Sequence, residues 1–441
     1  MNKVRLGEIA KVNSTTFCTD DFDEILYLDT SSVTKGVFDN FIHLSKNDKI
    51  PSRAKRAVKD KTIVYSTVRP NLQHFGIFNT PKENVVVSTG FATIDVKDNL
   101  ASPKFLYYCL TQDKFTNYLH TIATNNVSSY PSINPSDLES LELEIPKDIK
   151  TQTAIARILS SLDDKIELNN KINAALENLA KTIYEYCFVQ NAEKTWERKS
   201  LKELGEFKNG ANYEKANEIG ERIKIVNVRD ISSSSFFIQV ENLDEIILQR
   251  NEIEKYLLCE NDIIFARSGI PGATRLIEKT EEDVIFCGFA IRFRLNDNNL
   301  KEYLFFSLKQ NEEFAKNKSG GSIMPNISQD ILKEISISIP PTELLEKFNK
   351  TVSPIFSAII KNRQESANLA QLRDFLLPLL LNGQVTMGKA QDEPTIIPFQ
   401  KNADSDTKYQ TWKEQIGIAA RGNIDEKTLH NIYDAIDEND R

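Results

Sequence analysis

One pattern of residues occurs twice in this 441-residue chain, at a constant separation of 194 positions. The first copy runs from Pro131-Ser132-Ile133 through spaced leucines to Ile145-Pro146. The second runs from Pro325-Asn326-Ile327 through spaced isoleucines to Ile339-Pro340. A long amphipathic stretch follows each copy. The duplication predicts two similar globular halves on a shared spacer, an arrangement that suits a two-part target better than it suits catalysis.

Each half has the pattern of an α/β domain. Residues 1–147 and 191–340 mix short buried-strand patterns with short helices, such as the helix expected to begin at Pro103, where Pro is favoured in the first turn. The segments that recur are 61–66 with 261–266, Gly90-Phe91-Ala92 with Gly288-Phe289-Ala290, and Leu6 and Ile9 with Leu201 and Leu204. We therefore expect the same framework twice.

Two stretches, 148–190 and 341–387, have apolar residues at alternating steps of three and four. This seam is typical of a coiled coil, and a lone helix would leave it exposed, so we expect the two helices to pack antiparallel. Polar residues interrupt both seams, at Asn169-Asn170 and at 362–366. The seam residues are Ile155, Leu159, Leu162, Ile166, Ile172, Leu176, Leu179 and Ile183, then Val352, Ile355, Ile359, Leu369, Leu372, Leu376 and Leu379. Pro378 is expected to kink or end the second helix, and Asn382-Gly383 to stop it.

Composition limits the location and the metal chemistry of the chain. The N-terminus lacks the apolar core of a signal peptide, and no stretch approaches the ~20 apolar residues of a membrane span. We expect a cytoplasmic protein with no membrane partner. The five cysteines and four histidines are scattered without zinc-site spacing, so no metal site is expected. The net charge of −8 includes an acidic extension at 388–441, expected to form short helices.

Basic and amide residues cluster in the first half. The segment 49–61 contains six Lys or Arg residues and one acidic residue, and the loop 69–74 follows it. Arg can hydrogen-bond guanine, and Asn or Gln adenine, in the major groove of DNA. A run of charged residues alone is more often a solvated surface. The basic segment together with the loop 69–74 makes nucleic-acid binding as good an interpretation as a solvated surface. The candidate contacts are Arg53, Lys55, Arg56, Arg69, Asn71, Gln73, Asn125, Asn126, Ser128, Ser129 and Tyr130.

The second half places glycine-rich loops at the matching points. The loop 267–275 corresponds to 69–74, and 318–326 corresponds to 124–132. Glycine allows a ligand to approach the backbone, and small hydroxyl and amide residues can donate to phosphates. Simple connecting loops remain the alternative. The candidate contacts are Arg229, Arg267, Ser268, Arg275, Ser319, Gly320, Gly321, Ser322 and Asn326.

Common motifs of enzymes are missing from the sequence. It has no phosphate-binding or dinucleotide-binding glycine loop and no nucleophile elbow. Asn134-Pro135-Ser136-Asp137 faintly resembles the N/D-P-P-aromatic signature of amino-methyltransferases, but it lacks the second Pro and the aromatic residue. A helix-capping turn is the better interpretation, and we predict no catalytic residues.

Four segments carry a resemblance to a known family: Gln152–Ile166, Asn173–Tyr184, Ile339-Pro340-Pro341 and Leu372–Gly383. Together with the repeat, they resemble the DNA-specificity (S) subunit of type I restriction–modification systems, from residue 4 to about residue 387. Two features depart from that pattern. Leu344-Leu345-Glu346 replaces the Gln expected near the start of the second helix, and the extension 388–441 passes the usual end. The extension 388–441 is either a docking element for partner subunits or a passive extension.

The resemblance implies an α+β fold: two α/β target recognition domains, separated by two long antiparallel coiled-coil helices, in a pseudo-two-fold internal repeat. Each domain would read one half of a split site on double-stranded DNA. The helices would set the spacing and hold two modification (methyltransferase) subunits, whose cofactor in that family is S-adenosylmethionine. Motor–nuclease restriction subunits can join such complexes. The S subunit itself would bind no cofactor and catalyse nothing.

Two other functions stay open on the sequence. The chain could be the recognition part of a fused restriction–methylation enzyme, or a coiled-coil adaptor that does not bind DNA. The missing enzyme motifs argue against the first, and the basic loops at repeat-matched positions argue against the second. Because the framework repeats while the loops differ, we predict an asymmetric two-part site and not a palindrome.

Overall fold

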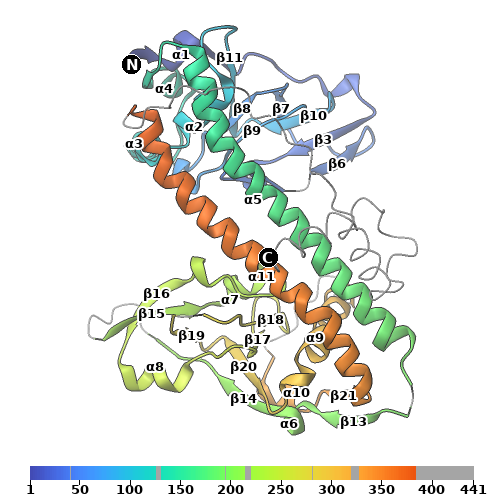
Figure 1. The fold of residues 1–441 in the computed structure, drawn as a ribbon. Coiled ribbons are helices and arrows are strands. Elements are labelled where there is room, and N and C mark those ends of the chain that lie inside the picture. Colours follow the sequence, from blue (N-terminus) through green and yellow to red (C-terminus); the bar gives the residue numbers. More distant parts are fainter. Residues whose placement is uncertain are drawn as a thin grey trace, which may run out of the picture. The chain divides into compact units, whose positions relative to one another are not determined.

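The computed structural model describes residues 1–39, 41–125, 131–193, 195–213, 220–280, 282–318 and 327–383, and its fold is drawn in Figure 1. These residues form two compact units. Unit 1 contains Met1–Ile166 and the described residues from Asn368 onward, and unit 2 contains Glu167–Ala367. The division falls inside the two long helices, so each helix contributes to both units. The extension predicted at 388–441 lies outside the described residues.

Unit 1 is built on two four-stranded sheets. One has the order β2-β11-β8-β9 and the other the order β6-β3-β10-β7, in which β10 pairs parallel with β3. The strands β8 (Ile63–Ser66) and β10 (Val85–Ser88) are buried throughout, as their β-branched residues favour. The remaining strands are β1 Asn2–Arg5, β2 Ala10–Val12, β3 Glu24–Leu28, β4 Val33–Thr34, β5 Val37–Phe38, β6 Ile42–Ser45, β7 Ala54–Ala57, β9 Phe75–Ile77, β11 Phe91–Val96 and β12 Glu142–Ile145, and the short helices are α1 Leu6–Ile9, α2 Pro103–Leu110, α3 Asp113–Asn125 and α4 Pro135–Glu139.

Unit 2 repeats this framework. Its four-stranded sheet has the order β14-β20-β17-β18, and its three-stranded sheet has the order β16-β15-β19 with β19 parallel to β15. The strands are β13 Glu197–Ser200, β14 Gly205–Asn209, β15 Glu221–Val226, β16 Asp244–Leu248, β17 Ile263–Ala266, β18 Thr274–Leu276, β19 Val284–Phe286, β20 Ala290–Leu295 and β21 Ser336–Ile339, and the helices are α6 Leu201–Leu204, α7 Val228–Ser233, α8 Arg250–Tyr256, α9 Lys301–Lys318 and α10 Gln329–Lys333. The predicted duplication is confirmed: α4 with α10 and β12 with β21 keep the offset of 194 residues.

One predicted match between the halves is wrong by a single residue. The sequence repeat matches Phe289 to Phe91, but the strand register gives a different correspondence. Phe91 lies opposite Ser66, whereas Ala290 lies opposite Ala266 at the same place in the second sheet. Phe289 is therefore the counterpart of Gly90. A shift of one residue turns a side chain to the other face of a strand, and Phe91 is 0% exposed while Phe289 is 63% exposed.

The long helices are α5 (Ile149–Tyr184) and α11 (Thr342–Leu381). Within unit 2 they pack antiparallel, because Asn169 Nδ2 donates to the carbonyl of Asn362, and Asn173 Nδ2, one turn later, donates to the carbonyl of Ile359. The polar interruptions predicted in both seams meet here, where Asn362 Nδ2 donates to Asn173 Oδ1 over 2.9 Å. A buried amide pair of this kind favours one register between two helices.

Most predicted seam residues are buried or half-buried, such as Leu159 and Val352, each 0% exposed. Leu372 is 45% exposed, so within this chain it is not part of the buried seam, and its place at a subunit interface stays a prediction. The second helix does not end at Pro378. Proline lacks an N–H and so removes one helical hydrogen bond, but the helix continues to Leu381. It stops at Gly383, whose φ of +68° favours glycine. Among the described helices, none is long and apolar enough to cross a membrane.

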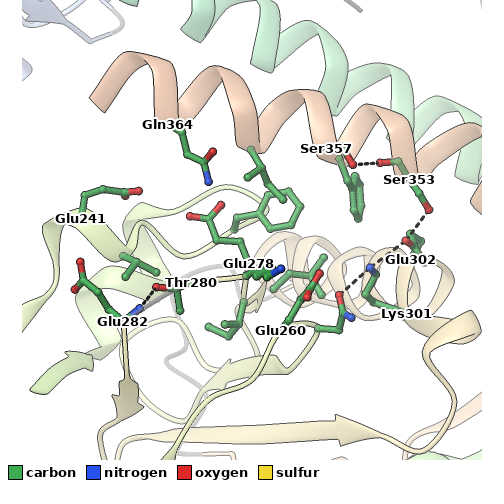
Figure 2. A pocket seen from close by; sticks show the side chains of 18 of the residues that line it. Glu241, Glu260, Glu278, Thr280, Glu282, Lys301, Glu302, Ser353, Ser357 and Gln364 are labelled. Atoms are coloured by element: carbon green, nitrogen blue, oxygen red, sulfur yellow. Dashed lines mark hydrogen bonds and ion pairs between the residues drawn. The ribbon is translucent and has the colours of Figure 1, made fainter. Parts of the chain in front are cut away.

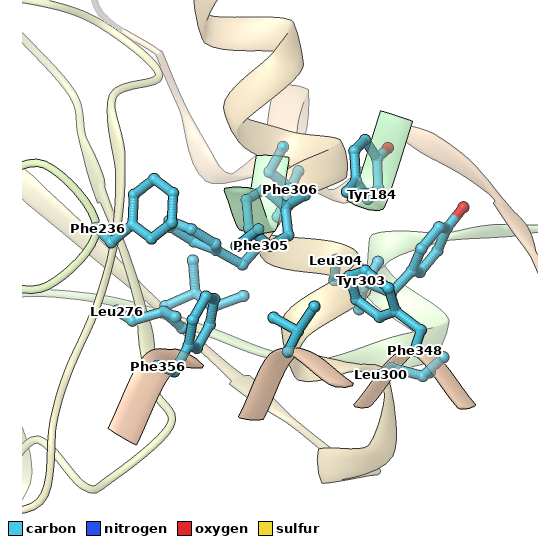
Figure 3. Close-up of a cluster of buried hydrophobic side chains, with 14 of the residues drawn as sticks. Tyr184, Phe236, Leu276, Leu300, Tyr303, Leu304, Phe305, Phe306, Phe348 and Phe356 are labelled. Atoms are coloured by element: carbon cyan, nitrogen blue, oxygen red, sulfur yellow. The ribbon is translucent and has the colours of Figure 1, made fainter. Parts of the chain in front are cut away.

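The core of unit 2 is rich in aromatic rings (Figure 3). Phe348 of α11 packs edge-on against Phe188, at 4.8 Å between centroids, and Phe236 packs edge-on against Phe305, at 5.1 Å. In unit 1 the start of α5 is fixed by a buried amide: Gln152 accepts from the Ser102 backbone N–H and donates to the Pro146 carbonyl, both over 2.8 Å. These contacts hold each recognition framework on its segments of the long helices.

Candidate nucleic-acid interface

Backbone hydrogen bonds tie four distant loops together in unit 1. The Thr67 N–H donates to the Gly90 carbonyl over 2.8 Å, and the Thr67 carbonyl accepts from Ile133 N–H over 2.9 Å. The Arg69 N–H donates to the Pro131 carbonyl over 2.9 Å, and the Thr89 N–H donates to the Arg53 carbonyl over 2.8 Å. The segment before β7, the loops after β8 and β10, and residues 131–133 therefore converge, and they carry several of the predicted DNA contacts.

The cations of the basic run in unit 1 differ in their exposure. Lys55 and Arg56 are neighbours in β7, at a register irregularity where Arg56 lies opposite Val87 and Ala54 opposite Ser88. Lys55 and Arg53 are exposed, whereas Arg56 is half-buried with its Nε enclosed by protein. Arg56 is therefore less available to DNA than the other two cations, and Arg53, at the loop junction, is the best placed.

The loop after β8 holds its amide residues in a fixed turn. Arg69 and Gln73 flank a short 3₁₀ turn, Pro70–Leu72, and both have positive φ, +47° and +55°. Asn71 is exposed at the tip. The Gln73 side chain donates to Asp113 of α3 over 3.2 Å, so it is partly engaged by the protein. Asn125, the last residue of α3, is exposed.

The same connections recur in unit 2. The Arg267 N–H donates to the Phe289 carbonyl over 2.9 Å, and the Arg267 carbonyl accepts from Ile327 N–H over 3.0 Å. Arg267 is thus the counterpart of Thr67. Its guanidinium Nη1 donates to the Gly288 carbonyl over 3.1 Å, which holds the side chain beside the turn between β19 and β20. Arg267 and Ser268 are half-buried at this junction.

Arg275 does not belong to the interface, and its predicted role in DNA contact is wrong. Its side chain is 4% exposed, and Nη1 lies 3.0 Å from Oε2 of the buried Glu312. Its Nε donates to the Ser234 carbonyl over 2.6 Å, and Nη1 also donates to the Thr274 carbonyl over 2.6 Å. Arg275 lies in β18, the edge strand of its sheet, and its charge is used to hold α9 in place through Glu312.

Arg229 is exposed but neutralised by acidic neighbours. Its Nη2 lies 2.5 Å from Asp244 and its Nε 3.3 Å from Asp230, and these contacts raise the pKa of the guanidinium. DNA binding at Arg229 would have to compete with both carboxylates. The other predicted contacts, Asn126, Ser128, Ser129, Tyr130, Ser319, Gly320, Gly321, Ser322 and Asn326, lie outside the described residues.

Phe289 is a residue at this interface that the sequence prediction missed. The repeat of Gly-Phe-Ala matches it to the buried Phe91 and so predicts a residue of the framework. Only the pairing of β17 with β20 places it at the loop junction, with its carbonyl on the Arg267 N–H. No signal in the single sequence distinguishes the two registers.

Unit 2 also contains a cavity of about 560 Å³, away from these loops (Figure 2). Lys301 lies 3.2 Å from Glu302, whose Oε1 accepts from Ser353 of α11 over 3.0 Å. Burial raises the pKa of Glu278 to about 7, although Arg363 lies 3.6 Å away and acts in the opposite direction. These pairs join the recognition framework to α11. In the described part of the chain, no three His, Cys, Asp or Glu side chains are grouped to hold a metal ion.

Residues 1–178 and 193–371 match the family described as type I restriction modification DNA specificity domain. The two matched segments cover both halves of the repeat and well over half of the chain. The chain belongs to this family. Membership confirms the resemblance inferred from the sequence, and it confirms the prediction of a DNA-specificity role in place of a catalytic one.

Similar proteins extend over most of the chain. It is 25% identical over 461 residues to the type I restriction enzyme HindI specificity subunit of Haemophilus influenzae, covering 86% of this chain and 98% of that protein. It is 27% identical over 380 residues to the MjaIX specificity subunit of Methanocaldococcus jannaschii, covering 78% and 84%. The crystal structure of a type I restriction–modification S subunit from M. genitalium has the same fold, with a TM-score of 0.52, 17% identity and coverage of 88% and 96%.

Proposed function

We propose that this chain recognises an asymmetric two-part DNA sequence, with the loops of unit 1 reading one half and the loops of unit 2 the other. It would position two modification subunits, which use S-adenosylmethionine, and the motor–nuclease subunits of a type I complex. One observation carries the proposal. The residues at the loop junctions occupy the same framework positions in both units but have different chemistry, Thr67 and Gly90 against Arg267 and Phe289.

The chemistry of these positions suits base recognition in two different sequences. An arginine can donate two hydrogen bonds to guanine, and Asn71 can make the equivalent contact with adenine. Phosphate contacts position a protein on DNA without specifying sequence, and base contacts supply the specificity. Different base-reading residues on one framework therefore give two different half-sites.

The acidic charge of the chain fits a shared DNA-binding surface. The net charge is −8, so the subunit alone has little long-range attraction for DNA. Partner subunits would supply much of the positive field. We expect the isolated chain to bind its site weakly and with a steep dependence on salt. Tight, sequence-specific binding by the isolated chain at physiological salt would contradict this division of labour.

The half-site assignment is tested by exchanging single loop residues in the assembled complex. The chain is co-expressed with its modification subunits, and the methylated adenines of the host DNA are mapped by long-read sequencing. Asn71→Ala should relax one position in one half-site, and Arg267→Gln one position in the other. Each lost bidentate contact corresponds to about 1–3 kcal/mol of discrimination.

Arg222→Gln is the matched control for Arg267→Gln. Its side chain is 80% exposed and paired with Glu245 at the far end of β15. This variant should methylate the original motif. A change in both half-sites from one loop substitution, or no change from either substitution, would argue against the assignment.

The long helices are proposed to set the distance between the half-sites. Changing the length of α5 and α11 together by whole helical turns should change the number of unspecified bases between the half-sites and leave both half-sequences intact. If the half-sequences themselves changed, the helices would belong to the readout.

A further inference from the structure

Phe289 is a large apolar side chain that the fold leaves in solvent. It is 63% exposed, while Cys287 and Ala290 on either side are buried. Exposure of the ring gains nothing for folding, since the hydrophobic effect rewards only the area removed from water. In unit 1 the same framework position is Gly90, so the turn does not require an aromatic residue.

The backbone around Phe289 is fixed on every side. The Gly288 N–H donates to the Ala211 carbonyl over 2.7 Å, the Ala290 N–H to the Cys287 carbonyl over 2.9 Å, and the Phe289 carbonyl accepts from Arg267. A Cβ at residue 288 would meet the end of the Asn212 side chain, which would have to move. A ring held on such a rigid turn loses little conformational freedom when it binds.

The neighbour of Phe289 indicates what the ring meets. The Arg267 guanidinium donates to the carbonyl of Gly288, the residue just before Phe289. The Arg267 guanidinium, which has further N–H groups besides the one bonded to Gly288, thus lies at the turn that carries the exposed ring. In the major groove, guanine presents two acceptors to such an arginine, and thymine presents the only methyl group of the four bases.

We propose that Phe289 contacts the 5-methyl group of a thymine in the half-site read by unit 2, next to the base contacted by Arg267. The inference rests on the proposed function and specifies one contact of that interface. It makes Phe289 a specificity-determining residue with an apolar mode of readout, which the glycine at position 90 cannot provide in unit 1.

The test uses the complex of the full chain with its modification subunits and the motif found by methylation mapping. Each thymine of both half-sites, on either strand, is replaced singly by uracil, which lacks only the 5-methyl group. Binding is measured by fluorescence anisotropy at constant salt. At one position in the unit 2 half-site, uracil should weaken binding by the wild-type complex about fourfold, because a buried methyl group corresponds to ~0.8 kcal/mol.

The complex with Phe289→Ala should bind the thymine DNA no more tightly than the wild-type complex binds the uracil DNA. Replacing the same thymine by uracil should not weaken binding by this variant any further. Phe289→Leu keeps an apolar contact and should retain part of the discrimination. Both variants should melt at the wild-type temperature, because the ring is exposed. Thymines read by unit 1 should respond equally in all three proteins.

Three outcomes would overturn the inference: a unit 2 half-site without thymine, no position sensitive to uracil, or equal sensitivity in Phe289→Ala. If loop substitutions such as Arg267→Gln still alter one half-site, the proposed function stands while the role of Phe289 falls. If no two-part motif is methylated, both fall.

Discussion

Replacing Arg275 distinguishes a structural role from a DNA-contacting one. Both carboxylate and guanidinium of the Arg275–Glu312 pair are buried, at 3% and 4% exposure. In Arg275→Met the Glu312 carboxylate keeps its burial but loses its 3.0 Å partner, and the carbonyls of Ser234 and Thr274 lose their donors. Breaking a buried pair from one side typically costs about 3–5 kcal/mol, so we expect a loss of that size in the free energy of unfolding.

The loss is measured by urea unfolding of the full chain, followed by tryptophan fluorescence. Trp196 lies in unit 2 against Phe188. A Trp412→Phe background leaves Trp196 as the single reporter, because the sequence has two tryptophans. In Arg275→Met the Glu312 carboxylate keeps only Lys309 at 4.0 Å and the Thr274 N–H at 3.2 Å. The double variant Arg275→Met/Glu312→Met removes this buried charge and should recover about half of the loss or more, since apolar replacement of a buried pair is often near neutral.

Arg222→Met is the control, because its ion pair is exposed and should contribute no more than about 1 kcal/mol. The reasoning would be refuted by two results together: a free energy of unfolding for Arg275→Met within about 1 kcal/mol of the wild-type value, and loss of binding of the assembled variant complex to its DNA site. That result would place Arg275 on DNA, as its sequence position suggested.

Two further predictions concern the packing and titration of unit 2. Phe348→Ala should lower the free energy of unfolding by about 3–5 kcal/mol in the same assay, because the ring is 2% exposed and packs on Phe188; Phe348→Leu should lose less, and a loss below about 1 kcal/mol in the alanine variant would contradict this packing. Burial raises the pKa of Glu278 from 4.5 to about 7, so the folded state holds this proton longer than the unfolded state and its stabilisation is lost as pH rises between those values. The free energy of unfolding of the wild type should therefore fall by about 3 kcal/mol relative to that of Glu278→Gln across this window. Free energies from urea unfolding that change with pH in the same way for both proteins between pH 5 and about pH 8 would show that Glu278 is solvated.

Much of the framework follows from the sequence because it depends on local periodicity. Apolar steps of three and four predict helices such as α5 and α11, and the repeated Ile-Pro endings predict β12 and β21 with their offset of 194. The capping turn predicted at Asn134 is also confirmed, since its N–H donates to Asp137 over 2.7 Å. These features need no knowledge of distant residues.

The orientation of charged and apolar side chains at the interface depends on distant residues. Leu372 satisfies the spacing of the seam but is exposed, because the helix is buried only where its neighbours reach it. Lys55 and Arg56 belong to one basic run, yet Lys55 is exposed and Arg56 is half-buried with its Nε enclosed by protein. Composition counts both in the same way, and only tertiary packing separates them.

The sequence by itself determined the duplication, the two long helices and the membership of a family of DNA-specificity proteins. Only the tertiary structure decided which of the candidate residues lie exposed at the loop junctions. Arg267 and Arg275 lie in one loop segment of the sequence, yet β18 and α9 bury the second against Glu312 while the first remains at the loop junction. The pairing of β17 with β20 likewise sets the register, and a difference of one residue leaves Phe289 exposed to solvent. Burial and register are set by long-range packing, and local patterns do not encode them.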